Sequence, residues 1–276
     1  IEVDLSAVEP MIALPFHPSK AYPIREFLQN AKELLQGIDE EVKEQFPNLN
    51  MPSLVDKLDA EGNFHVDQGI VAGCSGGTYD NLCVVANVMR GHTPGNGSFT
   101  FSVYPGSQPA NLALAKAGVT ADLLESGIIV REAFCGPCFG AGDTPANGGF
   151  SIRHTTRNFI NRDGSKPGDG QLSYVALMDA RSIAATARNG GILTPADEVA
   201  FDESIPAYQY DKGLYQRRVF HADKADPSVE LVMGPNIKDW PTMPALKEHL
   251  MFKVVSSLLD PVTTTDELIP SGETSS

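Results

Sequence analysis

The feature of the sequence that most limits its possible folds is an alternation of short apolar stretches with helix-like stretches over residues 66–191. Short, nearly continuous apolar stretches are typical of strands buried on both faces of a parallel sheet, and the stretches between them have apolar residues at helical spacing. We therefore predict an α/β fold, a three-layer α/β/α arrangement with a mostly parallel sheet. The predicted strands lie within VDQGIVAGC, SFTFSVYP, IIVREAF and LSYVALM, and the predicted helices within TYDNLCVVANVMRG, SQPANLALAKAG, TADLLESG and DARSIAATARNGG.

The boundaries of further elements are predicted from prolines, glycines and capping residues. Residues 1–20 contain three prolines and are expected to be extended. The amphipathic stretch YPIREFLQNAKELLQG is predicted to form a helix that ends at Gly37. Residues 39–64 are polar, contain two prolines and are expected to form a surface excursion. In the last predicted helix, Asp179 is the expected N-cap and Gly190 lies near the expected C-cap.

The composition argues against several classes of protein. A net charge of −14 disfavours a general binder of nucleic-acid backbones, which needs an excess of Lys and Arg. The sequence has no apolar run of the ~18–20 residues that a membrane span needs. Four cysteines in 276 residues do not make a disulfide scaffold, so we expect a reducing, cytoplasmic location.

Both ends of the chain suggest a piece of a longer protein. It begins at Ile1, without a methionine and within a strand-like stretch, and it ends in the polar run DPVTTTDELIPSGETSS. Residues 1–195 are predicted to form one α/β domain. Residues 196–262 have no regular pattern and are predicted to be a peripheral extension and linker.

A pair of cysteines, Cys135 and Cys138, has the CGPC spacing of the redox-active pair in thioredoxin-type proteins. Such a pair needs its first cysteine at the N-terminus of a helix, which lowers the thiol pKa. The twelve residues after Cys138 contain four glycines and a proline, which disfavours a helix. A dithiol oxidoreductase is therefore the less favoured interpretation of this motif.

The other two cysteines allow a different interpretation. A structural zinc site commonly uses two pairs of ligands, and this chain has one CxxC pair. Cys83 lies on the apolar side of a predicted helix and is expected to be a buried core thiol. Cys74 and Cys135 each follow a predicted strand, so their turns can converge on one edge of a parallel sheet. Three cysteines suit a four-iron cluster in which one iron lacks a cysteine and can act as a Lewis acid in hydration or dehydration.

Three arginines, Arg153, Arg157 and Arg162, follow the cysteine pair in the segment SIRHTTRNFINRDGS. Guanidinium groups bind carboxylates through two parallel hydrogen bonds. The alternative is that the three arginines are solvated surface residues. Their position shortly after the cysteine pair favours carboxylate binding, and His154 is the one histidine expected near the same site.

These segments resemble three sequence blocks of the aconitase family of iron–sulfur hydro-lyases, in the order in which the family has them. VAGCSGGTYDNL resembles the block with the lone cluster cysteine, AFCGPCFGAGD the block with the paired cysteines, and TTRNFINRDGS the substrate-binding block. DLSAVEPMIALPFHP is similar to the entry into the family's third domain, and DPVTTTDELIPSG to the start of its mobile fourth domain. Residues 263–276 would then begin a truncated C-terminal swivel domain.

The resemblance implies a [4Fe-4S] cluster and a hydratase or dehydratase that acts on a hydroxy-di- or tricarboxylic acid. In the family the base and the acid pairs lie on other domains, so the chain alone is expected to be inactive. Its expected partners are those domains and the small-molecule substrate. The implied residues are Cys74, Cys135 and Cys138 as cluster ligands, Thr156, Arg157 and Arg162 as substrate-binding residues, and Asp266 as a catalytic residue.

The sequence departs from the family pattern at three positions. Gly76 and Thr156 stand where the family has asparagine, and Glu267 stands where it has histidine. Because Gly76 and Thr156 adjoin the implied cluster and carboxylate pocket, the identity of the carboxylic acid stays open. Two other functions also stay open: a non-catalytic iron-sensing module, for which the acidic charge argues against RNA binding, and the dithiol oxidoreductase.

Overall fold

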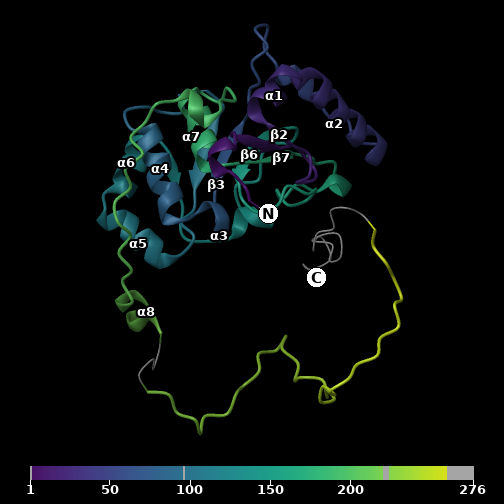
Figure 1. Cartoon of the computed structure of the whole chain (residues 1–276), viewed down its shortest axis with the longest axis vertical. Coiled ribbons are helices and arrows are strands. Elements are labelled where there is room, and N and C mark those ends of the chain that lie inside the picture. Colours follow the sequence, from purple (N-terminus) through teal and green to yellow (C-terminus); the bar gives the residue numbers. More distant parts are fainter. Residues whose placement is uncertain (1, 96, 220–223, 260–276) are drawn as a thin grey trace.

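The computed structural model describes residues 2–95, 97–219 and 224–259. Within them, seven strands form one sheet in the order β2-β1-β7-β6-β3-β4-β5 (Figure 1). Strands β7, β6, β3, β4 and β5 are parallel, whereas β1 is antiparallel to both of its neighbours. The predicted α/β fold with a mostly parallel sheet is confirmed. The strands are β1 (Met11–Ala13), β2 (Ala21–Pro23), β3 (Gln68–Val71), β4 (Thr100–Val103), β5 (Ile129–Val130), β6 (Phe150–His154) and β7 (Tyr174–Met178).

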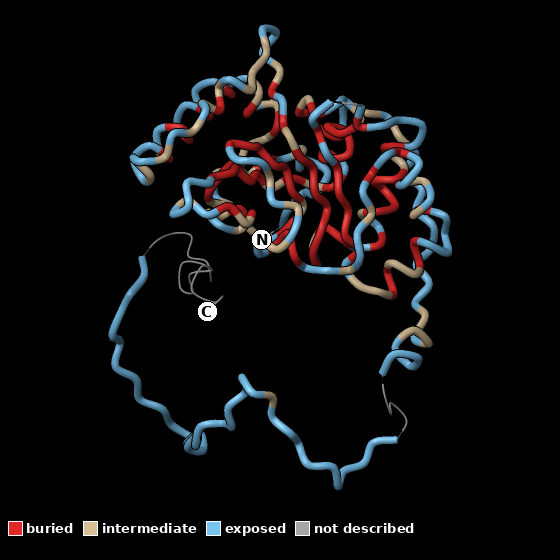
Figure 2. Tube along the Cα trace, turned by 180° about the vertical axis from the view of Figure 1, so that it is seen from behind, coloured by how far each residue is buried: buried red, intermediate tan, exposed pale blue. Residues whose placement is uncertain are grey.

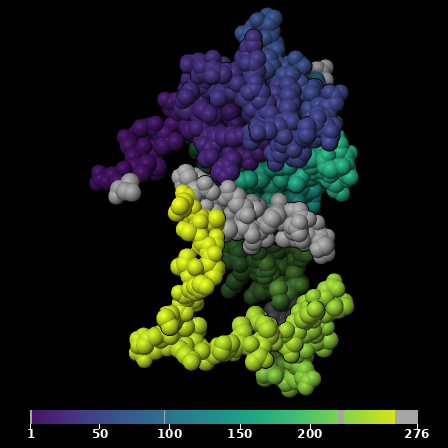
Figure 3. All heavy atoms as spheres, turned by 90° about the vertical axis from the view of Figure 1, so that its right-hand side faces the viewer, coloured from purple at the N-terminus to yellow at the C-terminus, as the bar shows by residue number. Residues whose placement is uncertain are grey.

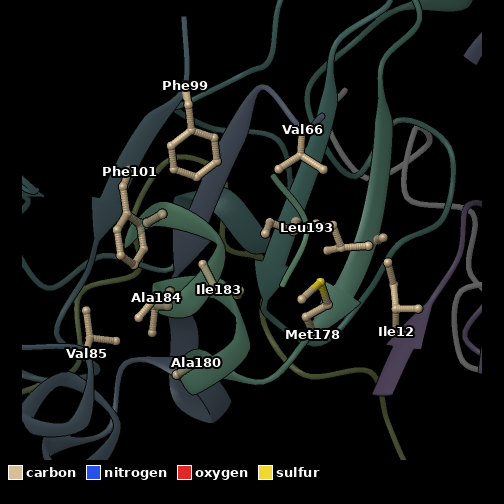
Figure 4. Packing of buried hydrophobic residues seen from close by; sticks show 14 of the residues in the cluster. Ile12, Val66, Val85, Phe99, Phe101, Met178, Ala180, Ile183, Ala184 and Leu193 are labelled. Atoms are coloured by element: carbon tan, nitrogen blue, oxygen red, sulfur yellow. The ribbon is translucent and has the colours of Figure 1, made fainter. Parts of the chain in front are cut away.

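Helix α7 packs on one face of the central strands, whose residues are mostly buried (Figure 2). Gly69 of β3 makes room for this helix, since a Cβ atom there would lie 2.9 Å from Cγ2 of Ile183. Ile183 and Ala184 lie among side chains of helix α4 and the sheet (Figure 4). Asp179 caps α7 as predicted, because its carboxylate accepts from the amides of the next turn. The helices are α1 (Ile24–Gln29), α2 (Ala31–Gln45), α3 (Gly73–Gly76), α4 (Tyr79–Met89), α5 (Gln108–Lys116), α6 (Val119–Glu125), α7 (Ala180–Arg188) and α8 (Gly213–Arg218).

The opposite face of the central strands carries a second, smaller apolar cluster. Side chains alternate between the faces of a strand, so Ile70 faces away from the side that Gly69 presents to α7. Ile70 packs there with Ala72 and Tyr104. The loop of residues 135–143, which we call the CGPC loop and which contains the 3-10 helix η3 (Gly136–Cys138), is held on this face by a buried side chain of β6.

Two predictions about the N-terminal part were wrong. The helical stretch does not end at Gly37 but continues as α2 to Gln45, because that glycine is solvent-facing, with no atom within 4 Å of a Cβ, and a helix interior tolerates it. Residues 39–64 are also more than a surface excursion. The Asp39 carboxylate accepts from the Leu54 amide at 3.0 Å, and Leu54 is buried in the core.

Two predictions about strands also need correction. The stretch IIVREAF contains only the short strand β5, Ile129–Val130, so Cys135 is reached through an irregular segment rather than directly from a strand. The sequence analysis also missed β6, Phe150–His154, which lies at the centre of the sheet. Both differences bear on the site, because the first lets the CGPC loop turn back across the sheet and the second fixes where the arginine segment begins.

The described residues from Asp197 onward are exposed or half-buried. None of residues 197–219 and 224–259 is buried. Residues 202–211 cross helices α4 and α5, where the Asn87 side chain donates to the Ser204 carbonyl at 2.8 Å and Lys116 pairs with Asp211 at 3.1 Å. Residues 224–259 form a thin extension beside the main body (Figure 3).

The predicted domain boundaries at residues 195 and 262 stay predictions, and residues 263–276 lie outside the described part. The described helices include none with the length and apolar character that crossing a membrane requires.

Candidate functional site

The site is built at the carboxyl ends of two parallel strands that are neighbours in the sheet. Strand β3 leads through Ala72 into helix α3, which carries Cys74, and β6 ends at His154. The two chain segments are joined at this edge by a hydrogen bond from the Ala72 amide to the His154 carbonyl, 3.1 Å long. The segment that contains Thr156 and Arg157 therefore begins beside the helix that holds Cys74.

Two glycines allow α3 to lie against its neighbours. Gly73 has a φ of +75°, and a Cβ atom on it would lie 2.6 Å from the sulfur of Cys138. A Cβ on Gly76 would lie 2.0 Å from the His154 carbonyl oxygen, so asparagine cannot replace this glycine without a shift of the backbone. Because α3 also contacts η3, the structure brings Cys74 and Cys138 to adjoining backbone segments, as the sequence analysis anticipated.

The two cysteines of the CGPC loop differ in their surroundings. Cys135 is exposed, as is Cys74, whereas Cys138 is 4% exposed. Burial raises the pKa of the Cys138 thiol, the charge and hydrogen bonding of the adjacent Cys135 raise it further, and hydrogen bonding from Thr156 opposes the rise. Cys135 precedes a three-residue 3-10 helix rather than an α-helix, so it lacks the helix dipole that activates a redox dithiol.

The donor set of this site consists of thiols. Cys74, Cys135 and Cys138 could together hold a cluster, whereas Cys83 is buried in the core on α4, as predicted, and burial raises the pKa of its thiol. In the described part of the chain, no three His, Cys, Asp or Glu side chains lie close enough together to hold a single metal ion. A cluster makes a different demand, since each cysteine binds its own iron and the sulfurs stand further apart. Three soft cysteine sulfurs without carboxylates or imidazoles suit an iron–sulfur group. The Cys138 sulfur lies against Gly73, where a Cβ atom would stand 2.6 Å from it.

The predicted substrate-binding residues lie together beside Cys138. The Arg157 guanidinium donates to the Thr156 hydroxyl at 3.2 Å, and Thr156 in turn lies at the Cys138 sulfur. Burial lowers the pKa of Arg162, and repulsion from the charge of Arg157 lowers it further. This arrangement concentrates positive charge next to the buried cysteine, as a site for a carboxylate requires.

Asn158 fixes the arginine segment to the N-terminal part of the chain. It is fully buried, and its Nδ2 donates to the carbonyl of Leu14 at 2.7 Å and to that of Ala13 at 3.3 Å. Strand β1 thus positions the neighbouring Arg157, although the two are far apart in the sequence.

His154 lies beside the site but faces a separate cavity of about 480 Å³. Burial lowers the pKa of its imidazole, with a smaller opposing effect from the charge of Asp179, which lines the same cavity. The expectation that His154 lies at the site stays a prediction, because the cavity that it lines includes none of the cysteines and neither Arg157 nor Arg162.

The part of the chain that contains these cysteines and arginines matches one protein family. A family model described as "Aconitase family (aconitate hydratase)" matches residues 1–185. The chain belongs to the aconitase family. The resemblance stated from the three sequence blocks is thereby confirmed.

Among curated relatives of this aconitase-family chain are 3-isopropylmalate dehydratase large subunits. That of Clostridium botulinum (strain Eklund 17B / Type B) is 28% identical over 183 residues, which cover 65% of this chain and 42% of that protein. That of Clostridioides difficile (strain 630) is 31% identical over 140 residues, or 50% and 32% of the two proteins. That of Archaeoglobus fulgidus is 29% identical over 165 residues, or 58% and 38%. The chain therefore spans less than half the length of these relatives.

One arginine of the candidate site, Arg153, has an environment that was predicted wrongly from the sequence. Arg153 had been grouped with the exposed or carboxylate-binding arginines, but it is 1% exposed and its guanidinium lies inside the protein. The alternation of apolar Phe150 and Ile152 with Ser151 and Arg153 was a signal for a strand with one buried polar face.

A group of three polar residues at this site, Tyr104, Asp143 and Arg131, was also not predicted from the sequence. The Tyr104 hydroxyl donates to the Asp143 carboxylate at 2.8 Å, and Arg131 binds the other oxygen of that carboxylate at 2.8 Å. Burial, followed by the hydrogen bond and charge of Asp143, raises the pKa of Tyr104 to about 12. The contacts with Tyr104 and Arg131 thus fix Asp143 at the end of the CGPC loop. Asp266 and Glu267, which were also singled out from the sequence, lie outside the described residues.

Proposed function

We propose that this chain is the cluster-binding part of a hydro-lyase, a hydratase or dehydratase that acts on a hydroxy-di- or tricarboxylic acid. The observation that carries the proposal is the position of Cys138, whose sulfur lies against Gly73 of the Cys74 helix and beside Thr156, the partner of Arg157. The thiol of Cys138 and the guanidinium group of Arg157 therefore both contact Thr156. The names of the relatives, which are dehydratase large subunits, support the same reaction class.

The chain's residues would divide the work as follows. Cys74, Cys135 and Cys138 hold a [4Fe-4S] cluster, which when bound supplies a Lewis acid for a hydroxyl and a carboxylate of the substrate. Arg157 and Arg162 bind a second carboxylate and orient the substrate. The Thr156 hydroxyl accepts from Arg157 and so holds that guanidinium next to the cysteines.

The proton transfers need groups from elsewhere. A base that removes the carbon-bound proton and an acid that assists loss of hydroxide are not evident among the described residues near the arginines; the pKa of His154 is lowered, and its side chain lines a different cavity. We propose that Asp266 and further segments or subunits, which the longer relatives leave room for, complete the site. The isolated chain would then bind substrate without converting it.

Turnover by the full-length gene product tests this proposal. After anaerobic reconstitution with iron and sulfide, it should dehydrate or hydrate at least one member of a panel that includes citrate, isocitrate and 3-isopropylmalate. Arg157→Gln should abolish that turnover, while the 276-residue chain alone should have none. A full-length protein that holds its cluster and converts no member of the panel would favour the non-catalytic iron-sensing alternative.

A further inference from the structure

Arg153 is a buried side chain that joins the sheet to the CGPC loop. From β6 its Nε donates to the Ser151 hydroxyl at 3.0 Å, and Nη2 donates to Gln68 Oε1 at 3.3 Å. Its other bonds go to the loop itself. Nη1 donates to the Pro137 carbonyl at 2.9 Å, and Nη2 to the Asp143 carbonyl at 3.1 Å.

These bonds hold the loop at two points. Pro137 lies between the two cysteines, and Asp143 lies at the end of the loop, where Tyr104 and Arg131 bind its carboxylate. Gln68 adds a bond from its Nε2 to the same Asp143 carbonyl at 3.1 Å. The rigid planar guanidinium suits this task, because it can donate in several fixed directions at once.

The charge of Arg153 has no direct carboxylate partner. None of its hydrogen bonds goes to a carboxylate, and it forms no ion pair with a described residue. Burial lowers its pKa to about 10, while Asp163, Asp143 and the Cys138 thiol oppose the change, so it remains charged near neutral pH. A buried charge that lacks a close counter-charge is costly unless hydrogen bonds and other charges compensate for the loss of water.

We propose that Arg153 is a positioning residue that fixes the CGPC loop on the sheet. Its positive charge would also balance the negative charge of the thiolate-bound iron–sulfur cluster that the loop would hold. The inference rests on the proposed cluster site and deepens it. Hydrogen bonds and charges around metal-bound sulfurs tune how firmly the metal group is held. Arg153 acts through the backbone of the loop and does not contact substrate.

The test compares two variants of Arg153. Arg153→Met removes both the charge and the hydrogen bonds of the guanidinium group, whereas Arg153→Lys keeps the charge but not the planar guanidinium. Arg90→Met is the control, because Arg90 is exposed, follows α4 and pairs with Asp122 of α6 at 2.9 Å, outside the site. The first readout, amide hydrogen exchange, needs no metal. The amides of Cys138, Phe139 and Ala141 are bonded within the loop and should exchange at least about 10-fold faster in both Arg153 variants, with α4 and α7 unchanged.

The second readout is the rate at which a chelator removes iron from the reconstituted chain. We expect it to rise about 10- to 100-fold in Arg153→Met, less in Arg153→Lys, and not at all in Arg90→Met. If Arg153→Met does not fold, Arg153→Lys decides. If the loop amides of the folded Arg153 variants exchange at the wild-type rate, the positioning role is overturned. If Arg153→Met and Arg153→Lys release iron at the same rate, the role of the charge is overturned. A wild-type chain that binds no iron would refute the proposed function. Amide hydrogen exchange of the loop, which needs no metal, would still test the positioning role.

Discussion

The sulfur of Cys138 lies 2.6 Å from the point that a Cβ atom on Gly73 would occupy. Gly73 is the residue before Cys74, and its φ of +75° is one that residues with a side chain rarely adopt. Two requirements, a backbone conformation and a close approach, therefore meet at one glycine. They tie the geometry of the lone cysteine to that of the cysteine pair.

Gly73→Ala tests this relationship against a matched control. Gly62→Ala is the control, because Gly62 also has a positive φ, of +85°, but no atom lies within 4 Å of its Cβ position. Both changes should cost about 1–2 kcal/mol from the left-handed backbone, and Gly73→Ala should cost more because of its contact with Cys138, as measured by urea unfolding. Only Gly73→Ala should also prevent iron–sulfur reconstitution. Equal iron content in the two variants would show that the cysteines do not depend on this contact.

Gly76 is predicted to be intolerant of any side chain. A Cβ on it would lie 2.0 Å from the His154 carbonyl oxygen, a backbone atom that cannot rotate away. We expect Gly76→Ala to lower the free energy of unfolding by about 1–3 kcal/mol or to prevent folding. Gly37→Ala, within α2 and with open space at the Cβ position, should instead raise it by about 1 kcal/mol. Urea unfolding of both proteins gives the comparison, and a harmless Gly76→Ala would contradict the tight packing of α3 on β6.

Arg157 and Arg162 are predicted to bind a carboxylate of the substrate. Replacing either by Gln should weaken binding of citrate or 3-isopropylmalate to the reconstituted chain by about 1.5–3 kcal/mol, the usual contribution of hydrogen bonds to charged groups. Arg188→Gln is the control, since Arg188 is on α7 and donates to the Ala200 carbonyl at 3.2 Å. Calorimetric titration under argon measures the effect. Affinities that fall equally in all three variants would indicate only a general charge effect.

Asp59 is predicted to contribute to stability in a pH-dependent way. Hydrogen bonding from His65, with a second contribution from Asn63, lowers the pKa of its carboxyl from 3.8 to about 2. A carboxyl whose pKa is lower in the folded state stabilises the fold above the unfolded pKa and loses this effect as the pH falls through the folded one. The difference in urea midpoint between wild type and Asp59→Asn should therefore shrink as the pH falls from 4 towards 2. A difference that stays constant over this range would contradict the assignment.

The sequence predicted those parts of the fold that depend on local pattern. The buried strands β3, β4 and β7 and helices α4 and α7 follow from apolar periodicity and from Asp179 as an N-cap. The pattern failed where a polar side chain is buried by partners distant in sequence. Strand β6 was missed because Ser151 and Arg153 form a buried polar face whose partners, Gln68 and the CGPC loop, only the tertiary structure reveals.

The candidate site was likewise predictable from local motifs but not in the contacts that depend on the tertiary structure. Cys74, Cys138, Thr156 and Arg157 could be singled out from motifs, and the structure brings their segments together. The residues that hold these side chains in place could not be predicted from motifs, because they act through contacts between segments far apart in the chain. Asn158 binds the carbonyl of Leu14, and no local pattern links those two residues.

The proposed function requires that cysteines from two separate segments, helix α3 and the CGPC loop, bind one iron–sulfur cluster. The most direct test is the iron and sulfide content of the anaerobically reconstituted chain in wild type, Cys74→Ser and Cys83→Ser, since Cys83 is a buried core thiol outside the site. We expect [4Fe-4S] stoichiometry in wild type and Cys83→Ser, and loss of most bound iron in Cys74→Ser. A Cys74→Ser protein that binds as much iron and sulfide as wild type would contradict the three-cysteine cluster site.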